Sequence, residues 1–194
     1  MTSSVRSLGL AGSAGFLLSL LSALPVQAHG PAGDHVTAGV LHPLTGLDHL
    51  LLLVGVGALA ARLDRRLLLP AVLGAVVGAL FGAWGGAMPA GELLAALSVS
   101  ALGLLLLLAL RLQGAGVPLA LAGTVVGVAV AIHALLHGQA AEGVPAWWLG
   151  ATLSAIGVVT GSGLVLRRAS PQALRLLALV LSFGGLALAL VPLA

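Results

Sequence analysis

The chain is built from apolar runs about as long as a lipid bilayer is thick, separated by short segments rich in glycine, proline or charge. Beyond residue 28 there are about six such runs, at 41–61, 68–88, 93–111, 117–137, 147–166 and 173–193. A hydrocarbon core about 30 Å thick requires roughly 20 apolar residues in a helix. The sequence therefore predicts an all-α integral membrane protein, a compact bundle of about six transmembrane helices forming a single polytopic domain over 29–194.

Composition supports this class and excludes others. Of 194 residues, 60% are hydrophobic and 7% are charged, which is far below the charged fraction of a soluble domain. The absence of cysteine excludes a disulfide framework and thiolate metal ligands, and the absence of lysine excludes a Walker loop and Schiff-base chemistry. The sequence pI near 11.5 comes from arginines set between apolar runs, so it predicts membrane orientation and no nucleic-acid partner.

Residues 1–28 have the pattern of a signal peptide. Arg6 lies in a short polar start, residues 8–24 are apolar, and small residues stand at Val26 and Ala28. We expect cleavage before His29. An uncleaved anchor helix is the alternative. Either way the start lies in the cytoplasm and His29 emerges on the outer side.

The arginines beyond the signal segment indicate which loops are cytoplasmic. They follow or precede alternate runs, at Arg62, Arg65, Arg66, Arg111, Arg167, Arg168 and Arg175, whereas the other connections carry Glu92 and Glu142. Cytoplasmic loops are enriched in basic residues, and this assignment agrees with the signal segment at every loop. We therefore expect a multi-pass protein of the bacterial inner (plasma) membrane, with both mature termini outside the cytoplasm.

Glycines repeat at helical spacing along three of the runs. They are Gly74, Gly78 and Gly82, then Gly123 and Gly127, then Gly157 and Gly161. Small residues on one helix face allow close approach of helices in lipid. We expect all three sets to make helix contacts.

Polar side chains gather in two segments, residues 42–49 at the start of the first run and residues 133–142 at the end of the fourth. The predicted topology places both at the outer face. His133 and His137 are four residues apart and share one helix face. His42 and His49 are about 10 Å apart along a straight helix, so Pro43 and Gly46 would have to bend the chain for both to reach one ion.

The donor types suit a borderline divalent cation. Imidazole and carboxylate ligands favour Ni²⁺, Co²⁺ and Zn²⁺, and the lack of cysteine with only two methionines argues against Cu(I). We predict His42, Asp48, His49, His133 and His137 as metal ligands. Neutral imidazoles are required, so uptake is expected to weaken below roughly pH 6. The spans hold no His-Glu-x-x-His or Gly-x-Ser-x-Gly motif, and no enzyme is predicted.

Simpler roles compete with metal binding at these positions. Thr45 and Asp48 have the spacing of a helix capping box, with the helix beginning just after Thr45. His133 and His137 could form interhelical hydrogen bonds instead. Trp147 and Trp148 are explained by an aromatic belt at the outer interface.

Three further residues are weaker candidates for capturing a metal outside the membrane. His29 would carry a free amine beside its imidazole after cleavage, and His35 follows in the same short tail. An unstructured polar leader explains both equally well. Glu142 is either an ordinary loop residue or a ligand on the path into the site.

The segment from His42 to Leu50 resembles the His-Pro-x-x-Gly-x-Asp-His-x-Leu signature of the HupE/UreJ family of hydrogenase and urease accessory membrane proteins, and His133 to Glu142 is similar to that family's second His-rich motif. The resemblance implies Ni²⁺, or Co²⁺, as cargo that feeds a metalloenzyme such as hydrogenase or urease. It also implies nickel chaperones or metalloenzyme maturation proteins as intracellular partners.

From the residues and the resemblance together we expect a secondary permease that imports a divalent cation and holds no permanent cofactor. A non-transporting metal-binding accessory or sensor protein is the alternative, because the spans below the histidines lack obvious ligands. An intramembrane metalloenzyme is disfavoured, because besides Asp48 and Glu142 no general acid or base is evident.

Overall fold

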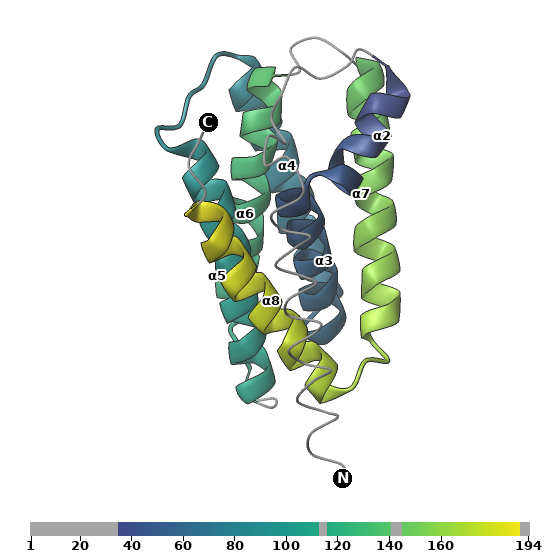
Figure 1. The fold of residues 1–194 in the computed structure, drawn as a ribbon, viewed down its shortest axis with the longest axis vertical. Coiled ribbons are helices and arrows are strands. Elements are labelled where there is room, and N and C mark those ends of the chain that lie inside the picture. The colour runs from purple at the N-terminus through teal and green to yellow at the C-terminus, as the bar shows by residue number, and fades with distance from the viewer. Residues whose placement is uncertain (1–34, 113–115, 141–144, 191–194) are drawn as a thin grey trace.

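The computed structural model describes residues 35–112, 116–140 and 145–190, and within them all regular structure is helical. The elements, shown in Figure 1, are α2 (Val36–Thr45), α3 (Leu47–Arg62), the short 3₁₀ helix η1 (Arg65–Leu67), α4 (Leu68–Ala83), α5 (Gly91–Arg111), α6 (Leu119–Ala140), α7 (Pro145–Leu166) and α8 (Pro171–Ala189). The expected signal peptide, residues 1–28, lies outside the described residues.

The number of helices that could cross a membrane agrees with the prediction. Five stretches are long and apolar enough, namely Arg65–Ala83 and helices α5, α6, α7 and α8. Helices α2 and α3 satisfy the same criteria only as a pair, and they are bent by 79° at their junction. Counting this pair as one broken span gives six, so the predicted all-helical membrane class is confirmed.

The expected run at 41–61 is not one straight helix. Gly46 separates α2 from α3 with an extended backbone (φ −78°, ψ 116°), and its N–H donates to the carbonyl oxygen of His42. Pro43 lies inside α2, one turn before the break. We expected that the chain would have to bend at Pro43 and Gly46 for His42 and His49 to reach one ion. The structure has this break at Gly46.

The run expected at 68–88 is shorter than predicted, since α4 ends at Ala83. Gly85 adopts a left-handed backbone (φ +82°), and the N–H of Gly86 donates to the carbonyl oxygen of Phe81. This is a common way for a helix to terminate, and it depends on glycine at the left-handed position.

Helix α3 lies at the centre of the bundle, with α5 and α8 on one side and α7 on the other (Figure 1). Residues 55–60 of α3 are all buried. Its leucine and valine side chains form the core with residues of neighbouring helices, among them Leu52, Val56, Leu59, Val99, Leu102, Leu106, Val126 and Leu181. A helix that is buried on all sides is held in a fixed rotation, and this fixes the direction of the side chains at its first turn.

The glycine contacts predicted for the second and fourth runs are confirmed. A methyl group on Gly74, Gly78 or Gly82 of α4 would collide with backbone carbonyl oxygens of α6. On α6, Gly123 and Gly127 face Pro70. Helices α4 and α6 therefore pack backbone to backbone.

The contact predicted for Gly157 and Gly161 is wrong within the described chain. A methyl group at either position would meet open space. Gly150 lies two turns earlier on the same face of α7 and does pack tightly, against the backbone of Val36 and Val40 in α2. Because α2 ends at Thr45, this face of α7 is left uncovered farther along.

Candidate metal centre

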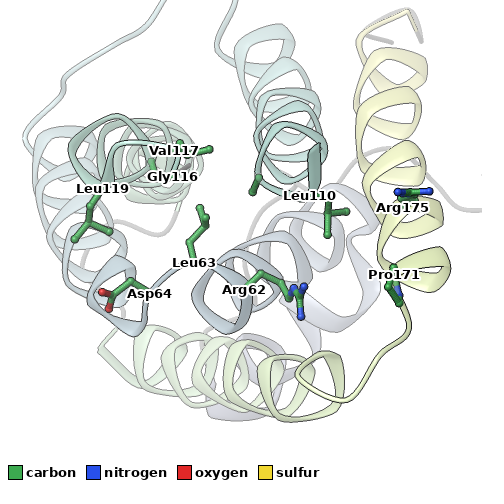
Figure 2. A pocket seen from close by; sticks show the side chains of 11 residues that line it. Arg62, Leu63, Asp64, Leu110, Gly116, Val117, Leu119, Pro171 and Arg175 are labelled. Carbon is green, nitrogen blue, oxygen red and sulfur yellow. The ribbon is translucent and has the colours of Figure 1, made fainter. Parts of the chain in front are cut away.

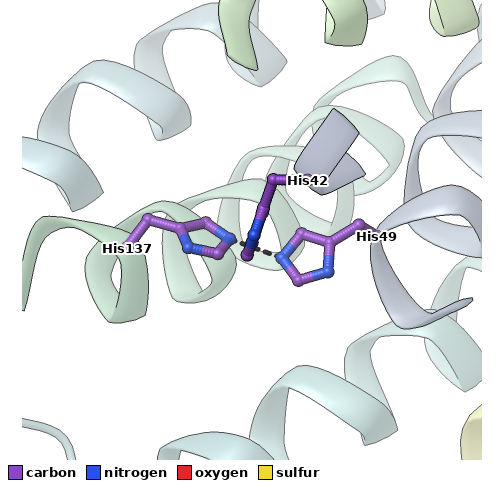
Figure 3. Close-up of side chains that lie close together, drawn as sticks. All are labelled: His42, His49 and His137. Atoms are coloured by element: carbon purple, nitrogen blue, oxygen red, sulfur yellow. Dashed lines mark hydrogen bonds between the residues drawn. The ribbon is translucent and has the colours of Figure 1, made fainter. Parts of the chain in front are cut away.

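Three histidines from three helices converge where α2 meets α3. His42 comes from α2, His49 from α3 and His137 from α6, and one ring nitrogen of each lies within 4.8 Å of the others. Figure 3 shows the three side chains pointing toward one common point, with the His42 ring edge-on between the other two. Their centroids are 4.9 Å apart for His42 and His49 and 4.6 Å apart for His42 and His137. The Nε2 atoms of His49 and His137 are in direct contact.

The break at Gly46 makes this convergence possible. On a straight helix a seven-residue separation places two side chains about 10 Å apart along the axis. The 79° bend instead turns α2 so that His42 reaches back over the start of α3. Two ligands close together in sequence thus approach the same point from different directions.

Helix α2 is held in this position by close packing on α7. A methyl group on Gly39 would collide with the backbone of Trp147 and Ala151, and one on Gly150 would collide with the backbone of Val36 and Val40. Gly39 lies about one turn before His42, so this contact fixes the depth and rotation at which His42 enters the site.

Asp48 orients His49. The Nδ1–H of His49 donates to Oδ1 of Asp48 over 2.8 Å, because a carboxylate oxygen can only accept. This leaves Nε2 of His49 as the atom that faces His42 and His137. A histidine ligand commonly has a carboxylate on its other ring nitrogen, which fixes the tautomer and increases the basicity of the ligating nitrogen.

His133 lies behind this first group. Its Nδ1–H donates to the carbonyl oxygen of Ala129 over 3.0 Å, and its Nε2 lies 3.8 Å from Oδ2 of Asp48. His133 lies one helical turn before His137 on α6, farther from the C-terminal end of that helix. The structure therefore arranges the five predicted residues in two tiers, His42, His49 and His137 in front, and Asp48 with His133 behind.

Trp147 forms a wall of the site, so its assignment to an aromatic belt is wrong. Its side chain is only 1% exposed, and its ring centroid lies 5.2 Å from that of His42 and 5.5 Å from that of His137. Trp148 is partly exposed and packs edge-on against Trp147. Adjacent residues on a helix point about 100° apart. The two tryptophans therefore face different directions, Trp147 into the bundle and Trp148 toward its edge.

The capping-box alternative for Asp48 is also wrong. Helix α3 begins after Gly46 with no side-chain cap, and the Thr45 hydroxyl donates backward to the carbonyl oxygen of Leu41 over 3.1 Å. His35 is exposed at the start of α2 and is not among the three convergent histidines. His29 and Glu142 lie outside the described residues, so their roles stay predictions.

Comparison with known proteins places the chain in a family. Residues 17–188 match the family described as HupE / UreJ protein. The chain belongs to the HupE/UreJ family. Protein HupE of Rhizobium leguminosarum bv. viciae is 34% identical over 123 residues, which cover 60% of this chain and 62% of that protein. The match thus spans less than two thirds of that relative's length. No solved structure matches the chain.

In this HupE/UreJ chain, the arrangement presents borderline nitrogen donors from three directions at a buried point. His49 and His137 are buried and His42 is partly buried, so a cation held there would lose most of its hydration shell. Three imidazole nitrogens beside one carboxylate suit a borderline divalent ion better than Mg²⁺ or Ca²⁺, which prefer oxygen ligands.

Proposed function

We propose that the chain is a secondary permease that imports a divalent transition-metal cation, Ni²⁺ in the first place and Co²⁺ as the other cargo. The observation that carries this proposal is the convergence of His42, His49 and His137 from three separate helices. Membership of the HupE/UreJ family supports a role connected with metal transport. The metal would serve maturation of an enzyme such as hydrogenase or urease, through intracellular nickel chaperones or maturation proteins.

We place the protein in the bacterial inner membrane, with the signal segment removed and both mature termini outside the cytoplasm. The histidine site then opens toward the outer side, and the arginine-bearing helix ends face the cytoplasm. A membrane potential of about 100 mV, negative inside, is worth about 4.6 kcal/mol for a dication. That drives an accumulation of about 10³-fold without ATP.

A second candidate is a membrane protein that binds metal without transporting it. The observation that favours it is the apolar packing below the histidines, where Leu52, Val56 and Leu59 of α3 are buried against leucines of α5 and α8. Within α3 itself, the histidine and carboxylate side chains are confined to the first turn, at Asp48 and His49. Inward passage would therefore require these helices to move apart.

Uptake of ⁶³Ni²⁺ into proteoliposomes with a potential negative inside, measured together with equilibrium Ni²⁺ binding to the purified protein, separates the two candidates. The wild type should bind and accumulate Ni²⁺, whereas His42→Ala with His49→Ala should do neither. Thr45→Ala is the control, because it removes an exposed polar side chain between the two histidines whose hydroxyl donates to the carbonyl oxygen of Leu41. Wild-type binding without accumulation above the double variant would favour the non-transporting candidate.

A further inference from the structure

A second polar feature lies at the opposite end of the bundle from the histidines. A half-open pocket of about 570 Å³ lies where α3 and α5 end and α6 and α8 begin. Its lining, most of which is labelled in Figure 2, consists of Arg62, Leu63, Asp64, Ala109, Leu110, Gly116, Val117, Leu119, Ala122, Pro171 and Arg175. This volume is within the range of small-molecule sites, about 300–1,000 Å³.

Two guanidinium groups give the pocket its chemical character. Arg62 and Arg175 belong to α3 and α8, and within the described part of the chain neither forms an ion pair with a carboxylate. The pocket's one acidic residue, Asp64, lies toward the other side in Figure 2, and its Oδ1 accepts a hydrogen bond from the backbone N–H of Arg66. The two arginines are therefore available to an anion.

The rest of the lining is apolar and lies at the membrane boundary. Leu63, Leu110 and Val117 form walls beside the arginines. By the distribution of arginines this is the cytoplasmic end, where the inner leaflet carries anionic lipid. Helices α6 and α8 both begin at the pocket, and the positive ends of their dipoles add to the attraction for an anion.

We propose that this pocket binds a phosphate group through Arg62 and Arg175, as part of an anionic phospholipid of the inner leaflet. Guanidinium groups bind phosphate oxygens in a bidentate manner, and the apolar walls accommodate the glycerol and the first acyl carbons. A metal cation is disfavoured there, because two arginines outnumber one aspartate. The proposal is independent of metal transport, since the pocket shares no residue with the histidine site.

Native mass spectrometry of the full-length protein in detergent tests the proposal directly. The wild type should retain dioleoylphosphatidylglycerol much more strongly than dioleoylglycerol, which has the same acyl chains and no phosphate. Equal retention of the two lipids would overturn the proposal, and this comparison needs no variant. Inorganic phosphate at millimolar concentration distinguishes the source. Displacement of the lipid would identify free phosphate as a ligand of the same arginines, and undiminished retention would identify the lipid.

A pair of double variants locates the site. Arg62→Gln with Arg175→Gln should weaken phosphatidylglycerol retention by about tenfold or more, since each basic residue near an anionic lipid contributes about 1 kcal/mol. Arg65→Gln with Arg168→Gln removes the same charge from the same end of the bundle. These two arginines are exposed, as Arg62 and Arg175 are, but they do not line the pocket. Equal loss in both double variants would show a diffuse charge effect and would contradict a site at the pocket.

Discussion

The Nδ1 atom of His49 lies 2.8 Å from Oδ1 of Asp48, the residue immediately before it in the chain. Both residues lie in the first turn of α3. The other oxygen of Asp48 faces His133. Asp48 thus connects the front tier of the site with the tier behind it, and we infer that it positions His49.

Asp48→Asn should therefore weaken Ni²⁺ or Co²⁺ binding by about 10–100-fold, because the amide is a poorer acceptor for the Nδ1–H of His49 and lowers the basicity of Nε2. The visible absorption spectrum of bound Co²⁺ should stay close to that of the wild type, since no ligand is lost. Asp64→Asn at the other end of the bundle is the control. A changed Co²⁺ spectrum in Asp48→Asn would mean that Asp48 is a direct ligand.

The two histidines of α6 should respond differently to substitution. His137→Ala removes a front-tier donor and should abolish Ni²⁺ binding at micromolar concentration. His133→Ala leaves all three front-tier nitrogens in place, so its affinity should fall by only about tenfold, as expected for an outer-shell partner. Isothermal titration with Ni²⁺ measures both. Equal losses would contradict the two-tier arrangement.

The packing of α2 on α7, through Gly39 and Gly150, should affect the Ni²⁺ affinity of the histidine site, although neither glycine is part of that site. Gly39→Ala introduces a methyl group that collides with the backbone of Trp147 and Ala151, so α2 must shift and carry His42 with it. Ni²⁺ affinity should drop, but by less than in His137→Ala, because His42 is displaced and not removed.

The matched control for Gly39→Ala is Gly161→Ala, whose added methyl group meets open space on α7. It should leave Ni²⁺ affinity unchanged and stabilise the helix by about 0.5–1 kcal/mol. Loss of affinity in the control, or none in Gly39→Ala, would contradict the positioning of His42 by α2.

Trp147 should be important for stability as well as for the site. Trp147→Ala leaves a cavity beside His42 and His137 and should destabilise the protein by about 3–5 kcal/mol, as large-to-small core substitutions do. Unfolding in sodium dodecyl sulfate, followed by circular dichroism, measures the change. Trp84→Ala is the control, since that side chain is 81% exposed, and it should have little effect. A similar loss in both variants would argue against a structural role for Trp147.

Much of the fold could be predicted from the sequence because lipid imposes one strong rule, that apolar segments form helices with internally satisfied backbones. The distribution of arginines over alternate loops predicted the direction in which each helix crosses the membrane. Those directions placed His49 and His137 at the same end of the bundle. The early end of α4 at Ala83 was not predicted, because it depends on the left-handed conformation of Gly85 within a segment that is still apolar.

The internal order of the site could not be predicted in the same way. Which histidines face one another depends on how α3 and α6 are rotated, and close contacts such as that of Gly82 with α6 determine this rotation. The sequence therefore grouped Asp48 and His133 with the front-tier histidines. It also missed Trp147, because a tryptophan near a predicted membrane interface has an ordinary explanation.

The break at Gly46 also reduces the thickness of the apolar layer that an ion bound at the histidines would have to cross. Helix α3 has 16 residues, so it is about 24 Å long. That is shorter than a hydrocarbon core of about 30 Å, a hydrophobic mismatch that a bilayer accommodates by thinning locally. In the orientation proposed above, His49 at the first turn of α3 would hold a cation at the outer end of this short helix, so the cation would have about 24 Å of apolar core to cross instead of about 30 Å.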